Sequence, residues 1–415
     1  MAKRLCLITT LLCLSFSFSQ VKEVNPPDYI KSITFKSAST DLGELPILRL
    51  GEPFYLEFDA LVNNEPDFYY KLEHYDFDWT ESALVRPEFL LGIDNFRIVD
   101  YTNSFNTFQL YSHYKLSIPN RQTRQLLVSG NYVISIYDEY DELVFSRKFM
   151  IYEDLVSIGL NVKRSRNVKT IDSVQTIDIE ISGGLRLNNP MQTIKTLLIQ
   201  NRNLNTAITD LKPQYTIGDK LIYRYTDKSA FYGGNEFRFF ENKDLRAAAM
   251  GVQFTRLKDI FHSYLFIDQP RAEQPYTYNP DINGRFTITA IDRDDLSVEA
   301  DYAMVHFSLN YPKFENGERI FIYGNYNNYA LDTYNEMIYN SESQLYESNF
   351  ILKQGFYNYK HVVVDKNGEL DEGIIDGNFW QTENNYKILV YYRDLGARYD
   401  RIIGFNEVSS VNISN

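Results

Sequence analysis

Cysteine is almost absent from this chain of 415 residues, and its two cysteines, Cys6 and Cys13, both lie close to the N-terminus. They fall inside the segment 1–19, which has the features of a secretory signal peptide. Removal of that segment leaves a mature chain without a thiol. The sequence therefore excludes disulfide bonds, cysteine metal sites and thiol nucleophiles in the mature protein, and it fits export to a bacterial periplasm.

The predicted signal peptide begins with the basic residues Lys3 and Arg4 and continues with an apolar stretch over residues 5–16. The triplet Ser17-Phe18-Ser19 follows and supplies a small-x-small cleavage site before Gln20. A buried core helix is the alternative interpretation of an apolar stretch of this length. The terminal position and the basic start favour a signal peptide, so we expect an exported protein.

Long apolar runs and an excess of basic residues are also lacking. Beyond the first 19 residues no apolar run is long enough to cross a bilayer, so the sequence predicts no direct membrane insertion. Aspartate and glutamate together number 55 against 42 lysines and arginines, which gives a net charge of −13. So acidic a chain argues against nucleic acid and against anionic lipid surfaces as partners.

Sequence motifs of catalysis are missing as well. The chain has no Gly-x-Ser-x-Gly nucleophile elbow, and the pairs Gly183-Gly184 and Gly233-Gly234 lack the Lys-Ser/Thr of a phosphate-binding loop. The histidines lie far apart in strand-like segments, where a core or surface histidine is commoner than a catalytic base. These are His74, His113, His262, His306 and His361. The sequence therefore predicts no catalytic site, no cofactor and no enzyme.

One short cluster, His74-x-Asp76-x-Asp78, resembles a metal site. Residues two apart on a strand share a face, so these three side chains would project together and the aromatic residues between them would project the other way. The alternation predicts a half-buried strand with its rings inward and a solvated polar face. A metal site and an acidic ridge that faces a partner are the alternatives, and we expect no metal.

A second acidic run, Asp365-Lys366-Asn367-Gly368-Glu369, invites comparison with a calcium-binding loop. Its glycine stands at the fourth position, whereas an EF-hand loop needs glycine at the sixth. Asn-Gly between alternating segments is instead typical of a type I′ hairpin turn. The run is therefore predicted to be a structural turn.

Aromatic residues are abundant, with 33 tyrosines and 28 phenylalanines. They favour strands, and Gly, Asn and Asp recur every ten or so residues, as in an all-β chain. Helical periodicity is not sustained anywhere, and residues 242–250 are the best candidate for a short helix. We predict an all-β protein of consecutive immunoglobulin-like or early-set β-sandwich domains, over residues 20–153, 154–281 and 282–415.

The C-terminal third carries two aromatic stretches at residues 324–329 and 355–365, Gly-Asn-Tyr-Asn-Asn-Tyr and Gly-Phe-Tyr-Asn-Tyr-Lys-His-Val-Val-Val-Asp. They resemble the early-set module of glycogen- and starch-binding domains, in which exposed tryptophans bind the sugar. Tyr329 stands where that motif carries tryptophan, and Trp380 lies in a different segment. A carbohydrate-binding protein is therefore the alternative function, and we expect glycan binding to be absent.

Runs of residues along the whole mature chain support a more specific resemblance. In the first predicted domain they lie at residues 69–79, 88–92, 100–101, 104–107, 111–114, 119–120 and 129–132. Later runs are Gly-Gly-Asn-Glu-Phe-Arg-Phe-Phe at 233–240, Thr-Glu-Asn-Asn-Tyr at 382–386, Val-Tyr-Tyr-Arg at 390–393 and Arg-Tyr-Asp-Arg-Ile-Ile-Gly at 398–404. In the residues of these runs and in their order along the chain, the sequence resembles the plug protein of the Bacteroidetes type IX secretion system. One position departs from the family pattern, because Tyr75 stands where cysteine often follows the histidine.

This resemblance implies a periplasmic, non-enzymatic protein that docks on the outer-membrane translocon, a very large β-barrel. The protein would seal the periplasmic opening of that barrel when no cargo is passing. Exposed aromatic side chains in loops would anchor the contact, because aromatic residues and arginine dominate interface energetics. The candidate anchors are Tyr101 with Phe105 and Tyr326 with Tyr329, and core packing of each residue in its own sandwich is the alternative role.

Overall fold

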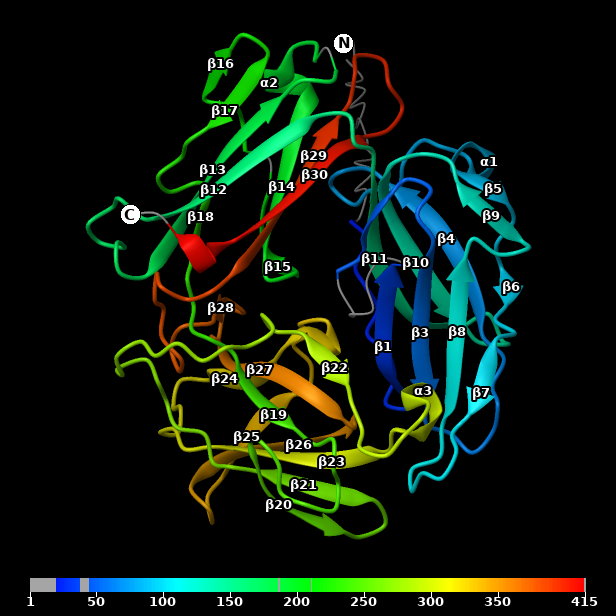
Figure 1. Ribbon diagram of the computed structural model, residues 1–415, viewed down its shortest axis with the longest axis vertical. Helices are drawn as coiled ribbons and strands as arrows, with labels where there is room; N and C mark the ends of the chain where they lie inside the picture. Colours follow the sequence, from blue (N-terminus) through cyan, green and yellow to red (C-terminus); the bar gives the residue numbers. More distant parts are fainter. Residues whose placement is uncertain (1–19, 38–44, 186, 210, 414–415) are drawn as a thin grey trace, which may run out of the picture.

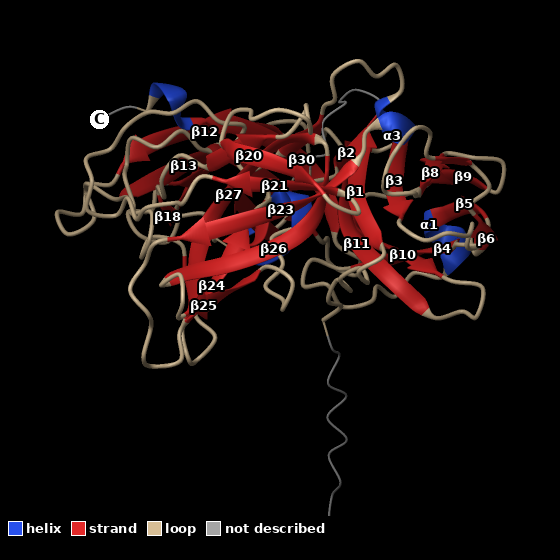
Figure 2. Cartoon of the chain, turned by 90° about the horizontal axis from the view of Figure 1, so that it is seen from below, coloured by secondary structure: helices blue, strands red, loops and turns tan. Residues whose placement is uncertain are grey.

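The computed structural model describes residues 20–37, 45–185, 187–209 and 211–413. The predicted signal peptide lies outside these described residues. Strands dominate the described chain and its helices are all short, so the all-β fold class is confirmed. Figure 1 shows three β-rich bodies arranged as a triangle, and Figure 2, seen from below, shows the first of them to one side of the other two. Among the described residues, no helix is both long and apolar enough to cross a membrane.

The first domain is a sandwich of two sheets whose strands are mostly antiparallel. One sheet has the order β1 (Ile30–Ser37), β3 (Phe54–Ala60), β8 (Ser112–Ile118), β7 (Tyr101–Asn103). The other has the order β2 (Ile47–Arg49), β11 (Leu143–Tyr152), β10 (Gly130–Tyr137), β4 (Tyr69–Tyr75), β6 (Phe96–Arg97). A small pair, β5 (Leu90–Gly92) with β9 (Thr123–Leu126), follows helix α1 (Arg86–Phe89). Strand alternation sends one side chain in two toward the gap between the sheets.

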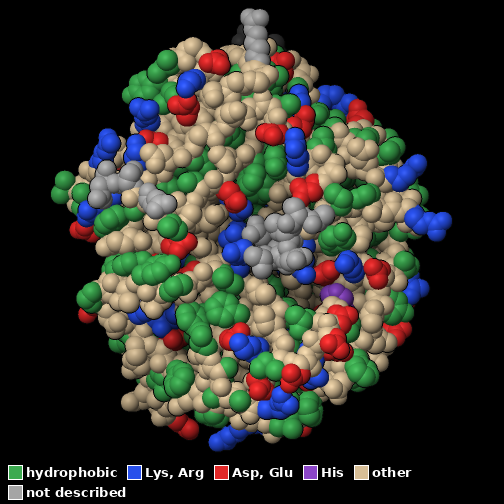
Figure 3. Space-filling model, viewed as in Figure 1, with side chains coloured by type: hydrophobic (Ala, Val, Ile, Leu, Met, Phe, Trp, Pro, Cys, Tyr) green, Lys and Arg blue, Asp and Glu red, His purple; other side chains and the backbone are tan. Residues whose placement is uncertain are grey.

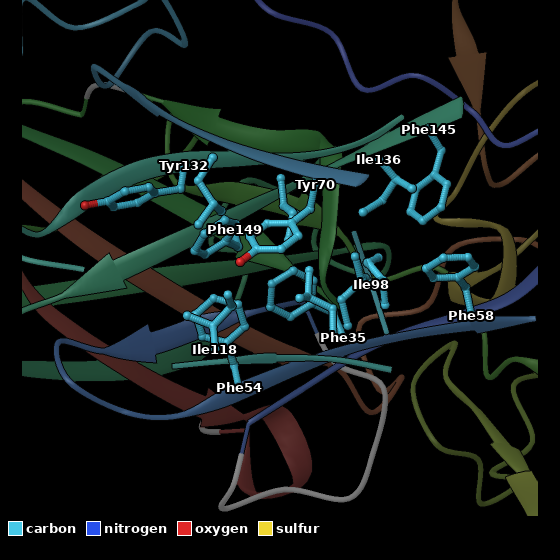
Figure 4. Close-up of a cluster of buried hydrophobic side chains, with 14 of the residues drawn as sticks. Phe35, Phe54, Phe58, Tyr70, Ile98, Ile118, Tyr132, Ile136, Phe145 and Phe149 are labelled. Atoms are coloured by element: carbon cyan, nitrogen blue, oxygen red, sulfur yellow. The ribbon is translucent and has the colours of Figure 1, made fainter. Parts of the chain in front are cut away.

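Aromatic rings fill that gap. Phe35 and Phe54 of one sheet and Phe149 of the other form a triangle with ring centroids 5.3 Å apart. Figure 4 shows these rings between the two sheets, with Tyr132 and Phe145 beside them. Buried aromatic side chains contribute about 0.5–1.5 kcal/mol per ring pair beyond the area that they remove from water. The high aromatic content of the sequence is therefore largely core content.

The second domain is completed by the C-terminal strands. One sheet contains β12 (Ser157–Arg164), β13 (Val174–Ser182), β17 (Lys220–Tyr223), β16 (Tyr215–Ile217) and β18 (Ala230–Tyr232). The facing sheet has the order β15 (Asn203–Thr209), β14 (Ile194–Gln200), β29 (Asn385–Tyr392), β30 (Arg401–Ser409). Two short helices, α2 (Pro190–Thr193) and η2 (Ser410–Asn412), border these strands.

The third domain is one long sheet that folds around its own core. Its strand order is β19 (Arg238–Glu241), β27 (Gly355–Val364), β24 (Arg319–Tyr323), β25 (Glu336–Asn340), β26 (Leu345–Lys353), β23 (Tyr302–Leu309), β21 (Phe261–Leu265), β20 (Val252–Leu257). Strands β22 (Phe286–Ile288) and β28 (Leu370–Asp371) also pair with β27. Helices α3 (Leu296–Glu299) and η1 (Asn325–Asn327) lie in its connections.

The predicted linear division of the chain is wrong at residue 282. Strand β29 pairs with β14, from Ile194 opposite Tyr392 to Gln200 opposite Tyr386, so the third domain is inserted into the second. Strand β29 is apolar along its length because both of its faces are covered by other parts of the protein. Ile388 and Val390 enter the core of the second domain, whereas Leu389 and Tyr391 pack toward the first domain.

Two local predictions also differ from the structure. Residues 242–250 form turns instead of a helix. The turn after β27 does connect two paired strands, but only Gly368 has a positive φ, of 87°, whereas a type I′ turn needs two such residues. The backbone N–H groups of Asn367 and Glu369 donate to the Asp365 carboxylate, and this bonding fixes the wider turn.

Candidate functional site: domain junctions and exposed loops

The first and second domains exchange hydrogen bonds through two aspartates. Asp76 accepts a bond from the backbone N–H of Asp400 at 3.0 Å and one from Arg393 at 2.8 Å. In return, the carboxylate of Asp400 accepts the backbone N–H of Phe77 at 3.1 Å. At the same junction the ring of Phe77 packs edge-on against the ring of Tyr391, with ring centroids 4.9 Å apart. Reciprocal bonds of this kind fix both the distance and the rotation between two domains.

The prediction that His74, Asp76 and Asp78 share the solvated face of one strand is wrong. Strand β4 ends at Tyr75, and Trp79 has a φ of +63°, so the three residues belong to a strand end and a turn. His74 is 2% exposed and bonds to Ser82 at 2.7 Å, and burial lowers its pKa to about 4. Across the described residues no three His, Asp or Glu side chains are grouped to hold a metal ion.

A buried charge cluster joins the first domain to the third. Asp59 of β3 accepts bonds from Lys353 at 2.7 Å, from the Tyr302 hydroxyl at 2.6 Å and from His113 at 2.6 Å. The Lys353 ammonium also donates to the backbone carbonyl of Ser297 at 2.6 Å. Burial alone would raise the pKa of Asp59, but Lys353 and His113 outweigh burial and hold it below its usual value. The carboxylate therefore stays ionised and binds both domains together.

The second and third domains meet through tyrosine and asparagine side chains. Tyr329 is 2% exposed, and its hydroxyl donates to the backbone carbonyl of Asn201 at 2.7 Å. Asn203 donates to the Tyr323 hydroxyl at 3.0 Å, and Asn205 donates to the backbone carbonyl of Tyr329 at 3.0 Å. Each domain thus contacts the other two through buried polar groups with partners. The three domains form one locked body.

Three of the four predicted anchors are packing residues. Tyr329 lies in the junction just described, and Tyr326 stacks on Phe350 with ring centroids 5.8 Å apart. Tyr101 stacks on Tyr114 at 5.3 Å against the core of the first domain. Exposed anchoring is therefore wrong for Tyr326 and Tyr329, because contacts between chain segments far apart in the sequence cover them. The burial of Tyr329 also removes the ring on which the glycan hypothesis depends.

Phe105 remains exposed, and the loop around it is apolar. We call residues 104–111 the 104–111 loop. Phe105, Phe108 and Leu110 are 67%, 55% and 54% exposed. The carboxylate of Asp301 accepts the backbone N–H groups of Phe108 at 2.7 Å and Gln109 at 3.1 Å, so the third domain holds this loop in place. Sequence reasoning missed Phe108 and Leu110, although both are apolar residues in a polar connection between strands.

Other apolar side chains are scattered over the surface. Figure 3 shows them interspersed with charged residues of both signs on the face viewed there. Sequence reasoning also treated the histidines as isolated, but His262 of β21 and His306 of β23 lie 2.8 Å apart between ring nitrogens. Burial lowers the pKa of His306 to about 4, so the pair carries no charge at neutral pH. The part of the chain that the structure describes places no third ligand beside them.

The fold and these junctions define a protein of three interlocked β-sandwich-like domains. Residues 30–153 match the family described as "Type 9 secretion system plug protein 1st domain". The chain belongs to the type 9 secretion system plug protein family, which gives it a role in type IX secretion and associates it with that machinery.

The fold is shared with a solved structure along nearly its whole length. The crystal structure of a hypothetical protein from Parabacteroides merdae ATCC 43184 matches with a TM-score of 0.90 and 33% sequence identity. The match covers 94% of this chain and 100% of that chain, so a second protein shares the overall arrangement of this fold. No curated protein matches this chain.

Proposed function

We propose that this protein is a periplasmic plug, which docks at the periplasmic opening of the type IX translocon barrel and seals it when no cargo is passing. The observation that carries the proposal is the locked three-domain body. A seal must keep its shape under thermal motion, and hinged domains would open gaps. Buried hydrogen bonds at all three junctions oppose such hinging.

The size of the body suits a steric role. A compact chain of this length has a radius of gyration on the order of 20 Å, which is enough to cover an opening several nanometres across. Reversible closure needs an interface of moderate area, roughly 1,000–2,000 Å² in total. The 104–111 loop offers apolar side chains on a backbone that is already fixed, so little conformational entropy is lost when it binds.

Deletion of the gene provides the cellular test. Loss of a plug is expected to make the outer membrane permeable to large solutes through the secretion barrel, while enzymatic processing of secreted cargo continues. An outer membrane that stays as tight as in the parent strain would contradict the proposal. Co-purification of the tagged protein with the translocon barrel tests the docking step separately.

A further inference from the structure

A cavity of about 90 Å³ lies between the first and third domains, beside strand β1. Apolar side chains from both domains make most of its wall, among them Ile33, Phe286, Tyr326 and Leu352. A smaller cavity of about 40 Å³ shares Ile33, Phe286 and Tyr326. Arg147 lines both cavities as well.

Arg147 has an unusual position for a charged residue. It lies on β11 two residues from Phe145 and from Phe149, so it shares the strand face that carries these core rings. Its side chain is only 9% exposed. The register of β1 against β3 shifts between Lys31 and Thr34, and this bulge borders the cavity into which the arginine faces.

The guanidinium lies over the ring of Phe145, with its central carbon 5.5 Å from the ring centroid, and forms few polar contacts. It donates one hydrogen bond, to the backbone carbonyl of Ser146 at 2.8 Å, although a guanidinium has five N–H donors. Among the described residues no carboxylate forms an ion pair with it, and Glu23 is the acidic group whose charge acts on it. Glu23 is itself occupied, because it accepts the backbone N–H of Lys148 at 2.6 Å and the amide of Asn328 at 2.9 Å.

The wall of this cavity also carries one lysine, Lys31, and two aspartates, Asp28 and Asp332. Lys31 lines the same cavity and lies 3.9 Å from Asp28. Asp332 accepts the backbone N–H of Tyr334 at 2.9 Å. Burial lowers the pKa of Arg147, because it disfavours the charged form of the guanidinium.

We propose that the cavity beside Arg147 binds a small carboxylate, whose two oxygens accept a bidentate pair of bonds from the guanidinium. Bidentate pairing is the geometry for which arginine and carboxylate are matched. A cavity of roughly 150 Å³ holds a benzene ring, so the present one suits a group of acetate or propionate size. A peptide chain is too large for it. Ile33, Phe286 and Tyr326 supply the apolar wall for the short carbon body.

Thermal unfolding of the full mature chain at constant ionic strength tests this inference. Sodium acetate and sodium propionate are titrated against sodium chloride, with neutral propionamide as the isosteric control. We expect a saturable rise in Tm with the two carboxylates and no rise with propionamide. Isothermal titration with propionate then measures the affinity directly. A wild-type protein that shows neither the rise nor the heat would overturn the proposal.

Variants assign the effect to the arginine. Arg147→Met is expected to fold, because it places an apolar side chain in a mostly apolar wall, and to lose the carboxylate-dependent rise. Arg147→Lys keeps the charge but loses the planar fork, so its affinity is expected to fall at least tenfold. Arg124→Met, at an exposed arginine of β9, is the matched control and keeps the full response. An equal rise in Arg147→Met would refute the assignment, and should that variant not fold, Arg147→Lys decides. The outcome is independent of the plug function.

Discussion

Asp59→Asn is the most informative single substitution, because it removes the negative charge on which the junction between the first and third domains depends. The Lys353 ammonium is 2% exposed, and Asp59 is the only carboxylate of the described residues that forms an ion pair with it. Asparagine keeps the shape and leaves that ammonium buried without a counter-charge. Breaking a buried pair in this way costs about 3–5 kcal/mol of unfolding free energy.

The double variant Asp59→Asn/Lys353→Met separates the charge effect from the general loss of packing. With both charges gone nothing is left uncompensated, so we expect its cost to be smaller than the sum of the two single costs by about 2 kcal/mol or more. Urea unfolding supplies the free energies, with fluorescence from Trp79 and Trp380 reporting on different parts of the fold. An Asp59→Asn cost below about 1 kcal/mol, or additive costs in the cycle, would refute the reasoning.

Three further outcomes follow from the structure. Phe105→Ser with Leu110→Ser should change the unfolding free energy by less than about 0.5 kcal/mol yet abolish co-purification with the translocon, since both side chains are exposed. Tyr329→Phe leaves the Asn201 carbonyl without its donor and should cost about 1–2 kcal/mol in urea unfolding. Burial raises the pKa of Asp281 to about 7, so the folded state holds a proton that the unfolded state releases, and stability falls as pH rises from about 4 to 7. Asp281→Asn should flatten the urea midpoint over that range, and parallel profiles would contradict the assignment.

The sequence was sufficient for the fold class because strand alternation and turn residues are local features. The aromatic and β-branched residues of β10 and β27 mark these segments as strands whatever their partners are. The connections between the domains could not be predicted from such local features. The pairing of β14 with β29 joins segments on either side of the whole third domain, and the alternation of side chains in a strand does not indicate which strand it pairs with.

The candidate site was predicted only in part, for a related reason. Alternation tells which side chains share a face, but it does not tell whether water or another domain covers that face. Tyr329 and His74 were expected on polar or exposed surfaces, and both lie under a neighbouring segment. Phe105 is exposed, and its role as an anchor stays a prediction. The aspartate that fixes its loop, Asp301, lies far away in the sequence, just before a strand, and belongs to no recognisable motif.

The insertion of the third domain between β18 and β29 sets the order in which the chain can mature. The first domain has all its strands once residue 152 is available, and the third once residue 371 is. The second cannot close until β30 has been made, because β14 gains its central neighbour only from β29. Until then β14 presents an unpaired edge, to which other extended chains can add. A chain that lacks β29 and β30 is therefore expected to fold its first domain and yet to expose the edge of β14 to other extended chains.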